Sequence, residues 1–174
     1  LALGGAALDV VVHGHRATGT GDGLAAGAAD GLMAVVELLN GGKLDYNVTL
    51  GANIDLAGKT WTPIGKVVAN SSDATKVASY EAYKGIFDGA GYTISNLTAD
   101  TSETKSVASA LGLMATTSGA TIKNLTLTGV DFKSYEYVGA LVGTTTGSSI
   151  TVENVHLRDA KIQGMRKNYS YAGV

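Results

Sequence analysis

Glu103, Asp131 and Lys161 are the residues of this chain whose types and spacing could support acid–base chemistry. Each follows an asparagine by seven residues, and successive members are separated by about 30 residues. If these stretches stacked like neighbouring strands, about 4.8 Å apart, the two carboxylates would be close enough to raise the pKa of one. Paired carboxyl groups hydrolyse glycosidic bonds, so a polysaccharide-degrading enzyme is one hypothesis. The positions fall at expected turns, where charged side chains are common, and we therefore favour a solvated edge without catalytic residues.

The histidines do not predict a metal site. His13 and His15 would lie on the same side of an extended segment, but only Asp9 is near enough in sequence to act as a third ligand. His156 stands between two aliphatic residues, which predicts that its imidazole faces solvent. The chain has no cysteine, which excludes thiolate ligands and a cysteine nucleophile. We therefore expect no metal, no cofactor and no enzymatic activity.

Two tyrosine pairs are the candidate ligand-binding residues. The stretch Tyr-Glu-Tyr-Val-Gly-Ala at 135–140 is echoed by Tyr-Ser-Tyr-Ala-Gly-Val at 169–174. In an extended strand both members of a pair face the same way, so stacked copies would form a small aromatic surface. Such a surface suits a carbohydrate or a host protein as partner. The alternative, which we favour, is that the rings pack between layers and bind no ligand. The candidates are Tyr135, Tyr137, Tyr169 and Tyr171.

A repeat of about 30 residues must position these side chains. Residues 93–99, 121–127 and 151–157 share the order Thr, aliphatic, any residue, Asn, aliphatic. Short alternating strands at such a period, with Gly and Asn at the corners, are typical of a β-solenoid, in which each coil pairs in parallel with the next. The equivalent asparagines are expected to stack in one hydrogen-bonded ladder and to take the left-handed conformation at a corner. This ladder comprises Asn96, Asn124 and Asn154, of which two also match the glycan acceptor pattern N-x-[ST].

A single helix is expected before the repeat. Residues 30–40 place Leu32, Val35, Val36 and Leu39 on one face, with Asp30 as the N-cap and two glycines after the end. The sequence therefore predicts three parts: an irregular segment at 1–27, a capping helix at 28–42, and a solenoid at 43–174 that continues beyond the chain end. An open solenoid end exposes strand edges, so end-to-end self-association is a further expectation.

Composition narrows the class of protein. The chain has 174 residues, 24 glycines and a formal net charge of −2, with scattered basic residues. This charge pattern lacks the basic surface that nucleic acid requires. No apolar run approaches the roughly 18 residues of a membrane span, so membrane insertion is not expected. Nor does the sequence carry a visible targeting peptide.

Three stretches resemble the GLUG-repeat proteins of bacterial surfaces. They are Asn-Val-Thr-Leu-Gly-Ala-Asn-Ile-Asp-Leu-Ala-Gly-Lys-Thr-Trp-Thr-Pro-Ile-Gly at 47–65, Tyr-Lys-Gly-Ile-Phe-Asp-Gly-Ala-Gly-Tyr-Thr-Ile-Ser-Asn-Leu at 83–97, and Val-Gly-Ala-Leu-Val-Gly at 138–143. The resemblance implies an all-β fold, a right-handed parallel β-helix with one short N-terminal capping helix. It also implies secretion or attachment to the bacterial cell surface. From it we expect a non-enzymatic, adhesin-like binding or structural module, with an accessory domain of a larger surface peptidase as another alternative.

Overall fold

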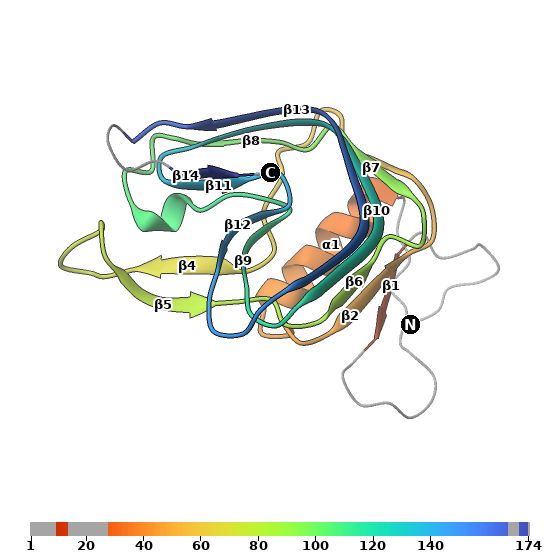
Figure 1. The fold of residues 1–174 in the computed structure, drawn as a ribbon, viewed down its shortest axis with the longest axis horizontal. Helices are drawn as coiled ribbons and strands as arrows, with labels where there is room; N and C mark the ends of the chain where they lie inside the picture. Colours follow the sequence, from red (N-terminus) through yellow and green to blue (C-terminus); the bar gives the residue numbers. More distant parts are fainter. Residues whose placement is uncertain (1–9, 14–27, 167–170, 174) are drawn as a thin grey trace.

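The computed structural model describes residues 10–13, 28–166 and 171–173, in which strands predominate and one α-helix is present (Figure 1). The helix α1 spans Ala28–Asn40, and a short 3-10 helix η1 spans Val107–Ser109. The strands are β1 (Val10–His13), β2 (Asn47–Leu50), β3 (Ile54–Asp55), β4 (Lys66–Ala69), β5 (Val77–Glu81), β6 (Ile86–Asp88), β7 (Thr93–Ser95), β8 (Thr98–Thr101), β9 (Met114–Thr117), β10 (Thr121–Ser134), β11 (Tyr137–Gly139), β12 (Val142–Thr145), β13 (Thr151–Gly164) and β14 (Tyr171–Gly173).

The largest sheet is built from successive passes of the chain that pair in parallel. Strand β10 pairs along one edge with β13 and along the other with β6, β7 and β8 in turn. Strands β6 and β7 pair in parallel with β2 and β3. Four layers result, at 47–64, 83–114, 117–142 and 145–166, and Figure 1 shows β10 and β13 following the same course around one side. The predicted parallel pairing of the repeat is therefore confirmed for these strands.

Both long strands bend twice, at residues with positive φ. In β10 the bends lie at Asn124 (φ 52°) and Gly129 (φ 62°), and in β13 at Asn154 (φ 50°) and Asp159 (φ 50°). Asparagine and aspartate tolerate this left-handed conformation better than most residues, and glycine adopts it freely. The two bends of each strand are separated by the same distance along the chain, and each one redirects the strand around the core.

The predicted column of three asparagines is wrong at its first member. Nδ2 of Asn154 donates a hydrogen bond to Oδ1 of Asn124 at 3.1 Å, as expected for stacked neighbours. Asn96 instead lies beside Gly129, and its Nδ2 donates to Oδ1 of Asp55 at 2.8 Å. Thr93, the first residue of β7, is in register with Thr126 of β10. The repeated motif predicts register with Thr121 instead. The asparagine of the motif therefore lies at the second bend in the second layer (Asn96, beside Gly129) and at the first bend in the third layer (Asn124).

A second wall of parallel pairs closes the layers on the opposite side. It consists of β9 with β12 and β11 with β14, joined by single parallel bridges such as Ile64 with Met114. Between the walls lies one hydrophobic core, which includes the fully buried Phe87, Phe132 and Tyr83. The described residues are therefore mostly strands, and most of these strands stack in parallel.

Helix α1 packs its apolar face into this core. Leu32, Val35, Val36 and Leu39 are at most 2 % exposed, which confirms the predicted face. The helix ends as predicted, since Gly42 has a φ of 115° and the Gly41 amide still bonds the Glu37 carbonyl at 2.9 Å. Within the described residues, neither α1 nor η1 is long and apolar enough to cross a membrane.

The start of α1 differs from the expectation, because Asp30 is not the N-cap. The helix begins two residues earlier, so Asp30 lies within the first turn. There its carboxylate forms an ion pair with Lys59 at 2.7 Å. An acidic side chain in the first turn is favourable because it faces the positive end of the helix dipole.

An antiparallel hairpin, absent from the prediction, interrupts the layers between residues 65 and 82. Strands β4 and β5 pair there, and the outer strand β5 is mostly exposed. The inner strand contributes Val67 to a small second core, together with Val107, Ala110 and Ala115. The hairpin thus leaves the stacked layers and returns to them without breaking their pairing.

Candidate functional site

A polar groove runs across the outer face of β8, β10 and β13. Its volume is about 580 Å³. Strand alternation creates it, because Val130, Phe132 and Ser134 of β10 point into the core while Asp131 and Lys133 point outward. Its polar lining includes Thr60, Thr98, Asp100, Asp131, Lys133, Lys161 and Gln163.

The structure brings Asp131 and Lys161 together but leaves Glu103 elsewhere. Asp131 is in register with Lys161 on one side and with Thr98 on the other. Glu103 follows the end of β8 and is exposed in the next turn. The predicted stacking of Glu103 on Asp131 is therefore wrong, because the shift in register that displaces Asn96 displaces Glu103 as well.

A different acidic residue, Asp100, enters the groove. Its carboxylate lies 3.5 Å from the amine of Lys133. Hydrogen bonds from the hydroxyl and the backbone amide of Ser102, with Lys133 nearby, hold the pKa of Asp100 below its usual value. Asp100 is therefore ionised near neutral pH, a state that can accept hydrogen bonds or bind a cation but cannot donate a proton to a leaving group.

The tyrosine candidates are only partly brought together. Tyr137 is in register with Tyr171, which confirms that the two tyrosine motifs stack as backbone. Tyr137 is half-buried and packs against the second core, while Tyr135 is half-buried as well. Tyr169 lies outside the described residues, and of Tyr171 only the backbone is described. For Tyr137, packing between layers accounts for the ring.

Glu136, between the two tyrosines, was missed by the sequence analysis. It is 4 % exposed, and its Oε1 accepts a hydrogen bond from Nη1 of Arg166 at 2.7 Å. Its backbone amide donates to the hydroxyl oxygens of Ser109 (3.1 Å) and Ser134 (3.3 Å). Among the described residues Oε2 has no hydrogen-bond partner. The alternation of side chains along a strand could have predicted the burial of Glu136, because a residue between two tyrosines on one face must point to the opposite face.

The asparagines at the bends are engaged in hydrogen bonds between layers. Nδ2 of Asn124 donates to Oδ1 of Asp88 at 3.2 Å and its Oδ1 accepts from Asn154. Partial burial raises the pKa of Asp88, but hydrogen bonds from the Ala90 amide and Asn124, with Lys123 nearby, outweigh it and leave the pKa lowered. The hydrogen bond from Asn96 is the main cause of the lowered pKa of Asp55. These contacts favour the structural interpretation of Asn96 and Asn124 over the glycan one.

Two of the three histidines, His13 and His156, lie within the described residues. His156 is exposed, as predicted, and its Nε2 lies 3.2 Å from Oδ1 of Asn154. His13 belongs to β1, in register with Asn47, whereas His15 lies outside the described residues. Over the described ranges, no group of three or more His, Asp or Glu side chains is placed to hold a metal ion.

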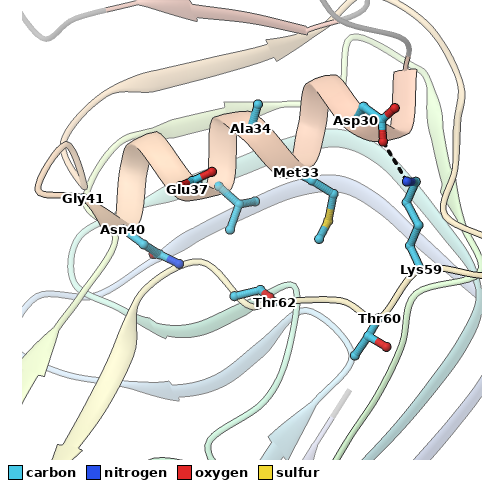
Figure 2. A pocket seen from close by; sticks show the side chains of 10 residues that line it. Asp30, Met33, Ala34, Glu37, Asn40, Gly41, Lys59, Thr60 and Thr62 are labelled. Carbon is cyan, nitrogen blue, oxygen red and sulfur yellow. Dashed lines mark ion pairs between the residues drawn. The ribbon is translucent and has the colours of Figure 1, made fainter.

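A second groove, of about 850 Å³, separates α1 from the chain at 59–62 (Figure 2). The Asp30–Lys59 ion pair closes one end. At the other end Asn40 joins the helix to the segment at 63–65. Its Nδ2 donates to the Pro63 carbonyl (3.0 Å), and its Oδ1 accepts from the Gly65 amide (2.8 Å). Between these contacts, Figure 2 shows the side chains of Met33 and Thr62. The groove follows from packing α1 on the first layer and carries no cluster of reactive groups.

Comparisons of the chain with protein-family models, with curated proteins and with solved structures found no match.

Proposed function

We propose that this chain is a β-solenoid binding module of a bacterial secreted or cell-surface protein and that it acts without catalysing a reaction. The observation that carries the proposal is the parallel register of β10 with β13 over nearly their whole length. A scaffold of this kind presents rows of outward side chains at a fixed spacing, which suits extended ligands.

The proposed solenoid is a right-handed parallel β-helix. Four layers pair in parallel on one wall, and further parallel pairs follow on the other. About 98 % of parallel crossover connections within a sheet are right-handed, which supports this hand. The resemblance to GLUG-repeat proteins supports the same fold and a location on the bacterial cell surface.

The polar groove on β8, β10 and β13 is the proposed ligand surface. Asp100 and Asp131 can accept hydrogen bonds from hydroxyl groups, and Lys133 and Lys161 can donate them. A hydroxyl-rich carbohydrate chain complements such a row of alternating donors and acceptors. The neighbours of Asp131 in register are a threonine and a lysine rather than a second carboxylate, an arrangement that favours binding over glycoside hydrolysis.

A glycan array probed with the purified protein tests the proposal. We expect the wild type to bind a subset of polysaccharides and the Asp131→Ala/Lys133→Ala double variant to lose at least tenfold in affinity. Lys84→Ala, an exposed change outside the groove, is the matched control and should bind like the wild type. A wild-type protein that binds neither the glycans nor a panel of host matrix proteins would contradict the proposal.

The tyrosines provide an internal comparison for the same assay. Because Tyr137 packs against the second core, Tyr135→Ala/Tyr137→Ala should lower stability more than glycan affinity. A loss of glycan binding in this variant, at unchanged stability, would move the proposed ligand surface from the groove to the tyrosines.

A further inference from the structure

The last long strand, β13, presents an unpaired edge. Among the described residues, β13 pairs with β10 alone, so its other row of backbone groups has no strand partner. An edge of this length readily pairs with another chain. At the opposite end of the molecule, the edge of β2 is covered by β1, and α1 covers the core.

The inward side chains of β13 are less covered than their counterparts in β10. Val152 is 47 % exposed, whereas Ile122, its neighbour in register, is fully buried. Val155, Leu157 and Ile162 are only half-buried, although they face the core. A further layer on this edge would therefore bury apolar surface, which is favourable in water.

The edge of β13 is complementary to itself when two copies run antiparallel about Leu157. Glu153 and Lys161 lie four residues on either side of Leu157. Each would therefore face the other residue type on the partner copy, so that two opposite-charge pairs form. Neither side chain forms an ion pair within the described part of the chain, and both are exposed. Directly opposed charges of opposite sign stabilise antiparallel pairs.

The same register also matches the apolar side chains and the bends. Val152 and Ile162 lie five residues on either side of Leu157 and would face each other across the pair. The bends at Asn154 and Asp159 lie three and two residues from Leu157, so both strands curve around the core at nearly the same place. The remaining outward pair, His156 with Arg158, adds no opposite charges.

We propose that this protein forms a two-fold symmetric dimer in which β13 of one copy pairs antiparallel with β13 of a second copy. The occupant of the open edge is thus a second copy of this chain. The inference does not depend on the proposed carbohydrate function. Because one strand edge forms a small interface, the dimer is expected to be weak and to depend on protein concentration.

Charge reversal tests the pairing. Sedimentation velocity over a concentration series should show a monomer–dimer equilibrium for the wild type. Glu153→Lys and Lys161→Glu each place like charges opposite one another twice, so each variant should dimerise roughly tenfold more weakly. Glu103→Lys, an exposed reversal away from the edge, is the matched control and should dimerise like the wild type.

Mixing the two variants is the decisive measurement. In a mixed pair, the Glu153→Lys copy offers an amine at both paired positions, and the Lys161→Glu copy offers a carboxylate at both. The mixture should therefore dimerise more strongly than either variant alone, a result that misfolding of either variant cannot produce. A wild type that stays monomeric, dimers indifferent to both reversals, or growth into filaments would each overturn the proposal.

Discussion

The strands β10 and β13 follow the same course but differ in their surroundings. They share length, parallel register and two bends each, yet β10 has strands on both edges whereas β13, among the described residues, has one neighbour. Phe132 is fully buried, while its partner in register, Ile162, is half-buried. Burial in this fold therefore depends on the number of adjacent layers as well as on the residue type.

Truncating the inward side chains should show the largest difference between the two strands. Phe132→Ala removes a ring from the closed part of the core and should lower the free energy of unfolding by about 3–5 kcal/mol. Ile162→Ala removes a half-covered side chain and should cost about 1–2 kcal/mol. Urea denaturation of both variants, at a protein concentration where the wild type is monomeric, measures the difference. Equal losses would mean that the layer of β13 is as closed as that of β10.

Changes at the bends should have an intermediate effect. Asn124→Ala removes hydrogen bonds to two layers and puts alanine at a φ of 52°, so we expect a loss of about 1–2 kcal/mol in unfolding free energy. Asn154→Ala also puts alanine at a positive φ, of 50°, but loses the contact to one layer only, so it should cost less, about 1 kcal/mol. Asn124→Gly is the control, because glycine accepts the positive φ and isolates the hydrogen-bond contribution. A larger loss for Asn154→Ala than for Asn124→Ala would reverse the comparison.

The smallest effect is expected in the acid range. The pKa of Asp88 is lowered in the folded protein, so its stabilising contribution is complete above the ordinary aspartate pKa of about 3.9 and is lost as pH falls through the lower folded-state value. Asn124→Ala removes one hydrogen bond to Asp88 and should raise this pKa toward the ordinary value. NMR titration of the carboxyl carbon measures it. Asp55 serves as the reference, since its pKa should respond to Asn96→Ala and not to Asn124→Ala.

The helix and the parallel pairing of the last two layers could be predicted from the sequence. The apolar spacing of α1 identified all four buried side chains, because a helix that covers a core must bury one continuous stripe. The repeat likewise identified the pairing of 121–127 with 151–157, where both bends of the two layers coincide.

The register of the earlier layers could not be read from the same motif. Asn96 and Asn124 have similar neighbours in sequence but occupy different bends, since two bends in close succession present the same local pattern. Because the predicted register was wrong, Glu103 was expected beside Asp131, and the actual neighbours Asp100 and Lys133 were not predicted. The β4–β5 hairpin was missed because its outer strand is exposed on both sides and lacks alternation.

The β4–β5 hairpin shows that the contour length of a layer is free to vary. In the large sheet, paired residues are 39 or 40 positions apart between the first and second layers, 33 to 35 between the second and third, and 30 between β10 and β13. On the second wall, the paired residues of β9 and β12 are 28 positions apart. The hairpin accounts for the additional residues between the first and second layers only, because it precedes β6 in the chain, and its tip at 70–76 extends beyond the paired strands (Figure 1). We therefore expect residues inserted at the exposed Ser71 and Ser72 to leave the alignment on either side unchanged. Ala74 is unsuitable for insertion, because its carbonyl accepts a hydrogen bond from the Val107 amide of η1 at 3.0 Å.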